Sequence, residues 1–105
     1  MKFYSIAELD ITDPSWVGPY VQTVTPMIER YGGRYLARTS NIQRLEGTRD
    51  RPQIYVIVEW PSRETALAFY ESEEYRPFRE QRQAGASNYF LVFPGEDVTG
   101  AAKIT

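Results

Sequence analysis

Cysteine and histidine are both absent from this 105-residue chain. Without cysteine there is no disulfide and no thiolate nucleophile, and without histidine there is no imidazole base. Ordinary zinc sites and haem sites with a histidine ligand are excluded for the same reason. Any chemistry must therefore use carboxylate, arginine and tyrosine side chains, and we expect no cofactor.

Long apolar runs and a strong excess of one charge are also missing. No stretch approaches the roughly 18 apolar residues of a membrane-spanning helix, and the amino terminus lacks a basic segment followed by an apolar core. We therefore expect no membrane association and, by default, a cytoplasmic location. The net charge of −2 provides no basic surface for a phosphate backbone, so binding to nucleic acid is disfavoured.

Hydrophobic spacing predicts elements in the order βαββαβ. Strands are expected at residues 3–9, 34–39 with a second piece at 42–46, 53–60, and 89–93. A first helix is expected over about 14–31, with a late start or a kink because Pro19 and Pro26 lie inside it. A second helix begins after Ser62 and is broken at Pro77.

This order predicts an α+β, ferredoxin-like sandwich over residues 1–95, followed by a polar C-terminal tail over 96–105. In that arrangement, both helices cover one face of a four-stranded antiparallel sheet. We expect the first and third strands to be parallel neighbours at its centre. The other face would be apolar and uncovered, which predicts a homodimer through the open sheet face.

Several runs resemble the DUF1330 family of the dimeric α/β-barrel group. They are "AELDITDP" at 7–14, "YGGRYLAR" at 31–38, "LEG" at 45–47, "VEWPSRETALAFYESEEYRPF" at 58–78 and "RQA" at 82–84. The resemblance implies that two ferredoxin-like sheets pack face to face as a barrel, and it implies no established activity. The wider group holds cofactor-free monooxygenases, haem enzymes and ligand-binding modules, so fold analogy does not select among them.

Two glutamates are the candidate catalytic residues. Glu8 and Glu59 each follow an apolar strand run, and parallel neighbouring strands would place both carboxylates side by side on the open face. Mutual repulsion would then raise one pKa and make a general base. Alternatively, the two carboxylates lie in water or pair with arginines across the dimer. Two acids alone are too few ligands to predict a metal site.

Arginines and tyrosines are the candidate ligand-binding residues. Arg34 and Arg38 are expected on one face of the second strand, where either would neutralise Glu59 or clamp an anion. Tyr4 and Tyr55 are candidates for an aromatic pocket, as are Tyr20, Tyr70 and Tyr75, although aromatic residues at such spacings are more often core.

The charged stretch from 71 to 82 is expected on a solvated helix face, with Arg82 as the residue to watch because it could reach back toward Glu74 or a neighbouring subunit. Together these features predict a dimer with a small-molecule pocket lined by Glu, Arg and Tyr. Cofactor-independent proton or oxygen chemistry is one extension of that prediction. A non-catalytic structural or regulatory binding module is the alternative, and whether the protein is an enzyme stays open.

Overall fold

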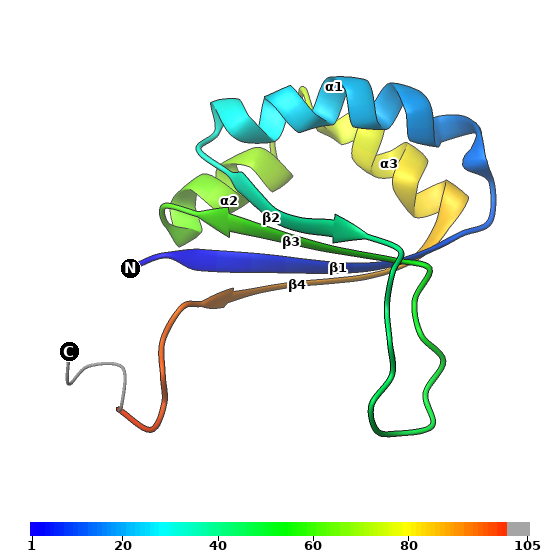
Figure 1. Ribbon diagram of the computed structural model, residues 1–105. Helices are drawn as coiled ribbons and strands as arrows, with labels where there is room; N and C mark the ends of the chain where they lie inside the picture. The colour runs from blue at the N-terminus through cyan, green and yellow to red at the C-terminus, as the bar shows by residue number, and fades with distance from the viewer. Residues whose placement is uncertain (101–105) are drawn as a thin grey trace.

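The computed structural model describes residues 1–100 and shows a layer of helices on one face of a four-stranded sheet (Figure 1). In chain order its elements are β1 (Phe3–Ile11), a 3-10 turn η1 (Pro14–Trp16), α1 (Val17–Arg30), β2 (Arg34–Thr39), β3 (Ile54–Trp60), α2 (Arg63–Tyr70), α3 (Arg76–Gly85) and β4 (Ala86–Pro94). The predicted α+β class and ferredoxin-like βαββαβ order are confirmed. Residues 101–105, part of the expected tail, lie outside the described residues, and the division at residue 95 stays a prediction.

The sheet has the strand order β2-β3-β1-β4, and every neighbouring pair is antiparallel. The prediction that the first and third strands are central neighbours is correct, but the prediction that they run parallel is wrong. The α1 crossover returns the chain so that β2 has the same direction as β1, and the following connection reverses it. As a result β3 must run against β1.

The helix boundaries follow local chemistry. The Asp13 carboxylate accepts a hydrogen bond from the Ser15 amide at 3.0 Å, and Pro14 begins a 3-10 turn before α1 starts at Val17. This is the late start that the internal prolines predict. Ser62 forms a capping box with Thr65 at the start of α2. The expected break near Pro77 is also present, since α2 and α3 are separate helices.

The connection between β2 and β3, residues 40–53, departs from the prediction because 42–46 form no strand. Side chains satisfy the loop backbone instead: the Arg51 guanidinium donates to the Ile42 carbonyl at 2.6 Å, and that of Arg44 donates to the Arg49 carbonyl at 3.2 Å. The loop projects from the sheet on the side away from the helices (Figure 1).

The core lies between the sheet and the helices. Trp60, Phe69 and Tyr75 are almost completely buried, and the ring centroids of Phe69 lie 5.4 Å from Trp60 and 4.2 Å from Tyr75. The indole Nε1 of Trp60 donates to the Ser5 hydroxyl at 3.0 Å, which ties β3 to β1. No helix of residues 1–100 is long and apolar enough to cross a membrane.

The opposite side of the sheet carries no helix (Figure 1). We call this surface the open face. Alternate residues of β1, β3 and β4 form most of it: Glu8 and Glu59, and the apolar or aromatic residues Tyr4, Ile6, Tyr55, Ile57, Tyr89, Leu91 and Phe93. Its exposed fractions include 55% for Tyr89, 48% for Leu91 and 40% for Phe93. The uncovered apolar sheet face that the sequence predicts is therefore present.

A cavity between the helices and the sheet

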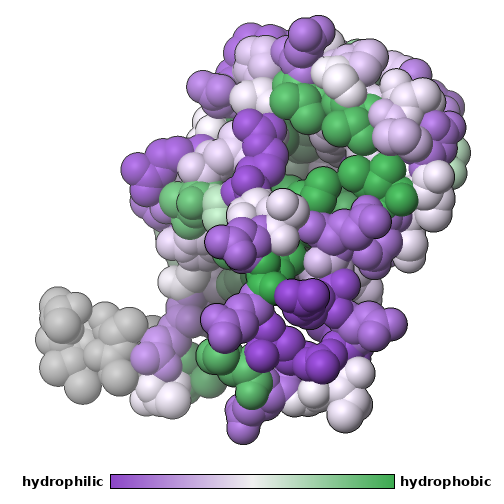
Figure 2. Space-filling model, turned by 45° about the vertical axis from the view of Figure 1, so that its right-hand side comes forward, coloured by the Kyte–Doolittle hydropathy of each residue, from purple (hydrophilic) through white to green (hydrophobic). Residues whose placement is uncertain are grey.

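A cavity of about 310 Å³ lies between the helical layer and the sheet. Most of its walls are apolar and come from all four strands and all three α-helices. Exposed residues at its rim include Val21 of α1 and Arg38, Thr39 and Ser40 at the end of β2. Figure 2 shows a hollow bordered by hydrophobic residues between the helical layer and the sheet, above the hydrophilic loop. The cavity is thus open to solvent on one side.

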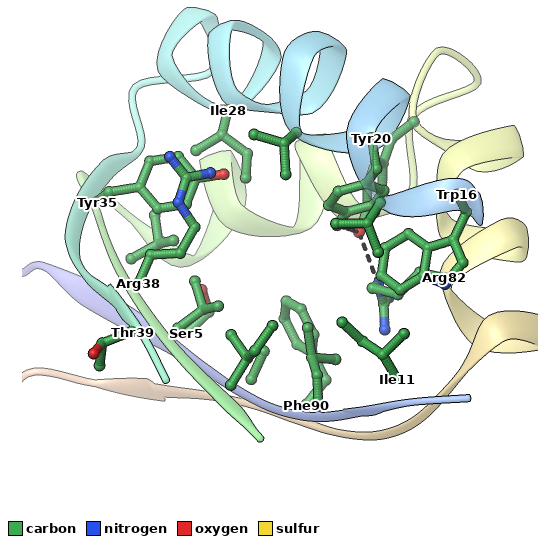
Figure 3. Close-up of a pocket in the computed structure, with 18 of the residues that line it drawn as sticks. Ser5, Ile11, Trp16, Tyr20, Ile28, Tyr35, Arg38, Thr39, Arg82 and Phe90 are labelled. Carbon is green, nitrogen blue, oxygen red and sulfur yellow. Dashed lines mark hydrogen bonds between the residues drawn. The ribbon is translucent and has the colours of Figure 1, made fainter. Parts of the chain in front are cut away.

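Arg82 reaches into the deep end of the cavity from α3 (Figure 3). The residue is only 2% exposed. Its Nη1 donates to the Asn88 side-chain oxygen at 2.6 Å, and its Nε donates to the Tyr75 hydroxyl at 3.3 Å. Its Nη2 is buried and has no hydrogen-bond partner within residues 1–100. The guanidinium is thus held in place by two contacts, and one end of it remains available.

The charge of Arg82 is also uncompensated. No carboxylate in the described part of the chain forms an ion pair with this residue. Burial alone lowers the pKa of Arg82, but its interactions with Tyr75 and Tyr20 more than offset this and leave the pKa raised. Arginine therefore remains a cation here at any ordinary pH. A buried cation without a counter-ion is an expensive arrangement in a folded protein.

Two tyrosine hydroxyls adjoin the arginine. The oxygens of Tyr20 and Tyr75 are 2.6 Å apart, and the Tyr75 oxygen also accepts from Arg82. Burial raises the pKa of Tyr20 well above its usual range, and the neighbouring Tyr75 adds to the effect. Both side chains line the cavity. The deep end therefore presents two hydroxyls beside a cation.

Arg38 lies on the other side of the cavity, at its rim (Figure 3). Its Nη1 donates to the Thr25 hydroxyl at 2.8 Å, and its guanidinium carbon lies 4.1 Å from the centre of the Tyr35 ring. The expectation that Arg34 and Arg38 share a face is wrong, because the register shifts between Tyr35 and Ala37. One extra residue in a strand moves the following side chains to the opposite face. Of Arg34 and Arg38, it is therefore Arg38 that borders the cavity.

The expected carboxylate pair does not form. Glu59 lies opposite Tyr4 and Glu8 lies opposite Tyr55, so the two glutamates are four residues apart along antiparallel strands, roughly 13 Å. Tyr4 and Tyr55 are likewise on the open face and do not line the cavity. The expectation of neighbouring carboxylates depended on parallel strands, and it is wrong for that reason.

Each glutamate is instead engaged by basic side chains. Glu59 accepts hydrogen bonds from the Lys2 ammonium and, at 3.2 Å, from Arg34. The Lys2 hydrogen bond is the main cause of a lowered pKa at Glu59, with the charges of Lys2 and Arg34 adding to it. Glu8 lies 3.5 Å from the Arg49 guanidinium. No group of three or more acidic residues in the described range could hold a metal ion.

Arg82 is the residue whose role the sequence interpretation missed. Its expected partner, Glu74, accepts instead from Arg30 at 2.7 Å. Within the charged stretch, one helix face points inward. Its residues Tyr75, Phe78 and Arg82 are three and four positions apart, the spacing of one helix face. Tyr75 is fully buried and Phe78 packs against the core. That spacing was the available signal that Arg82 points inward.

Comparison with known proteins places this fold in a family. The sequence model of a family described as "Domain of unknown function (DUF1330)" matches residues 2–95, and the chain belongs to this family. Its fold is the α+β, ferredoxin-like fold. No curated protein matches the chain.

Several solved structures share the fold at low sequence identity. A protein of unknown function from Rhodopseudomonas palustris, RPA0582, is 16% identical with a TM-score of 0.76, over 91% of this chain and 84% of that one. SnoaB, a cofactor-independent oxygenase from Streptomyces nogalater, is 13% identical with a TM-score of 0.61, over 91% and 94%. An antibiotic biosynthesis monooxygenase is 15% identical with a TM-score of 0.58, over 92% and 100%. These similarities establish the fold alone.

Proposed function

We propose that this protein binds a small organic anion in the cavity, with Arg82 as the anchor. The observation that carries the proposal is the buried Nη2 of Arg82, which has neither a hydrogen-bond partner nor a counter-charge within residues 1–100. Buried polar groups are nearly always satisfied, and an unpaired buried charge is costly. An anionic oxygen at this position would supply both the acceptor and the charge.

The walls define the rest of the ligand. Trp16, Val56 and Phe90 are typical of the lining, so most of the ligand surface must be apolar. The volume of 310 Å³ is at the lower end of the range for small-molecule sites, about 300–1,000 Å³. A carboxylate or phenolate attached to a compact apolar body fits this description. Arg38 at the rim is a second contact for an anion on its way in.

A homodimer through the open face is part of the proposal. Four strands of six to nine residues present roughly 500 Å² of surface, whereas a stable interface needs about 800 Å² from each partner. Residues 40–53 and 95–100 both project on that side of the sheet and extend the surface (Figure 1). Exposed Leu45 and Val98 lie on these two segments. A second copy of the chain would cover the apolar residues, and the cavity of each copy would lie on the far side of its sheet, away from the interface.

Cofactor-independent oxygen chemistry is the second candidate, and the arrangement of Arg82 with Tyr75 and Tyr20 favours it. A cation and hydroxyls at a buried site would stabilise an enolate or phenolate, the kind of anion that reacts with oxygen. No carboxylate of residues 1–100 lines the cavity, so the substrate would need to be acidic enough to lose its proton unaided. Two proteins with this fold are named as oxygenases. The non-catalytic binding module remains the alternative, with the same ligand and no turnover.

Calorimetric titration with matched acids and amides tests the binding proposal. Benzoate and 1-naphthoate should bind and raise the melting temperature, whereas benzamide and 1-naphthamide should not. Arg82→Gln should weaken binding of the acids by about tenfold or more, because a charged hydrogen bond is lost. Arg30→Gln, a surface arginine paired with Glu74, is the control. Equal binding of acids and amides, or no effect of Arg82→Gln, would contradict the proposal.

A further inference from the structure

A second cavity of about 220 Å³ adjoins the first, between α2 and the β1–β4 side of the sheet. Its lining is mostly apolar: Ser5, Trp60, Ala66, Leu67, Phe69, Tyr70, Phe90 and Val92. Among the residues that the structure describes, no acidic or basic side chain lines it. It therefore suits a hydrocarbon or aromatic group and offers nothing to a charged one.

The two cavities share part of their walls. Ser5, Trp60, Phe69 and Phe90 line both of them. Trp60 and Phe69 are 2% exposed and stack on each other, and Ser5 is held by its bond to Trp60. These three residues belong to the fixed packing of the molecule. Phe90 is the fourth residue that lines both cavities, and it is only partly buried.

Phe90 also lies close to residues of both cavities. It lies on β4, an edge strand that pairs only with β1, and its ring stands on the floor of the first cavity (Figure 3). The ring centroid is 5.4 Å from that of Tyr70, in the second cavity. The guanidinium carbon of Arg82 is 5.2 Å from the centre of the same ring. The Phe90 ring thus lies next to both the proposed anion anchor and Tyr70, a wall residue of the second cavity.

We propose that the two cavities act as one two-chamber site, with Phe90 as the residue that sets ligand length. The acid group binds Arg82 in the first chamber, and an apolar chain passes Phe90 into the second. The ligand class is therefore an elongated amphipathic carboxylic acid with one charged end and an apolar tail. This inference rests on the proposed binding of an anion at Arg82 and adds where the rest of the ligand lies.

The alternative path for a tail leads out through the rim beside Val21, which is 41% exposed. A tail in that direction would end in water, so added length would contribute little to binding. A tail in the second chamber is removed from water, and each added methylene should raise the affinity about fourfold until the chamber is full. Dependence on chain length therefore distinguishes the two paths.

The test is calorimetric titration of the full chain with straight-chain carboxylates from butanoate to dodecanoate. Wild-type affinity should rise steadily with length and then level off. Phe90→Trp should make the affinity level off at a shorter acid than in wild type. Phe90→Ala should make the affinity level off at a longer acid. Leu67 of α2 lines the second chamber but not the first, so Leu67→Phe, which narrows the second chamber alone, should act like Phe90→Trp.

Two controls keep the outcomes distinct. Phe93→Trp enlarges a side chain of the same strand on the open face, and it should leave the length profile unchanged. Arg82→Gln should weaken all lengths by the same factor. If acids bind through Arg82 but the profile is identical in wild type, Phe90→Trp and Leu67→Phe, the two-chamber inference is overturned and the anion site stands. If no acid binds, or Arg82→Gln changes nothing, the proposed function fails.

Discussion

The Nε of Arg82 donates to the hydroxyl of Tyr75 at 3.3 Å, and the two residues are seven positions apart, two turns of helix. Tyr75 in turn lies 2.6 Å from the Tyr20 hydroxyl. The Tyr75 oxygen therefore joins the buried cation to α1 and fixes one edge of the guanidinium. Asn88 accepts a hydrogen bond from Nη1, and Nη2, which has no partner within residues 1–100, is left for a ligand.

Removing the Tyr75 hydroxyl should lower stability and weaken anion binding together. Tyr75→Phe leaves Nε of Arg82 buried without a partner and costs about 1–3 kcal/mol of unfolding free energy. The guanidinium is then less well oriented toward the cavity. Urea denaturation with and without 1-naphthoate measures both effects.

Tyr31→Phe is the matched control for that variant. The Tyr31 ring also packs against Phe69, at 5.8 Å between centroids, and its hydroxyl forms no hydrogen bond within residues 1–100. It should change stability and binding little. Equal losses in the two variants would show that the hydroxyl of Tyr75 has no special role.

Glu59 should contribute stability that acid removes. The hydrogen bond from Lys2, with the nearby charges of Lys2 and Arg34, holds the pKa of Glu59 below its value in the unfolded chain. A lowered pKa stabilises the folded state above the unfolded value of 4.5, and the contribution is lost as the pH falls through the folded pKa. The advantage of wild type over Glu59→Gln should therefore shrink between about pH 6 and pH 3.

Denaturation midpoints across this pH range, at one fixed protein concentration, measure the effect. Glu71→Gln is the control, because Glu71 is exposed and forms no ion pair within residues 1–100. The difference between wild type and Glu71→Gln should stay constant. A wild-type advantage over Glu59→Gln that grows on acidification would contradict the assigned direction.

A charge on the open face should dissociate the proposed dimer. Leu91 of β4 lies on this surface, opposite Ile6 on β1, and is 48% exposed. Leu91→Lys would bury an ammonium group against the second copy, and we expect a monomer by light scattering coupled to size exclusion. Val21→Lys, at a similarly exposed site on the helical layer, should remain dimeric. A monomeric wild type at micromolar concentration would refute the interface.

Most of the fold could be predicted because its signals are local. Asp13 caps the 3-10 turn and Ser62 caps α2, close to where the sequence predicts helices to begin, and the apolar run at 53–60 is β3, one of the two central strands. The parallel assignment of β1 and β3 was wrong because local patterns carry no strand direction. Direction follows from the number of reversals along the chain.

The site was harder to predict because it depends on long-range geometry. A register shift of one residue moves Arg38 to the cavity and leaves Arg34 beside Glu59, and no turn residue marks that shift. Glu8 and Glu59 were candidates because each follows an apolar strand run, yet both lie on the open face, where basic side chains engage them. Arg82 was hidden in a charged stretch, although its spacing from Tyr75 and Phe78 was visible.

The contact between Gly85 and Trp16 should be sensitive to a single methyl group. A Cβ at Gly85 would lie 2.3 Å from the indole Cδ1, and the indole Nε1 donates to the Gly85 carbonyl at 3.1 Å. Trp16 lines the first cavity, so Gly85→Ala must displace a wall of the ligand site. We expect a loss of about 1–3 kcal/mol in unfolding free energy and weaker binding of 1-naphthoate.

Gly18→Ala separates this steric effect from the general effect of replacing glycine. A Cβ at Gly18 meets no atom within 4 Å, and the residue lies in α1. Alanine there should raise stability by up to about 1 kcal/mol, since it favours the helix and restricts the unfolded chain. Thermal denaturation and tryptophan fluorescence of both variants decide the matter. If Gly85→Ala is as stable as wild type with an unchanged Trp16 environment, the close packing at this wall of the cavity is refuted.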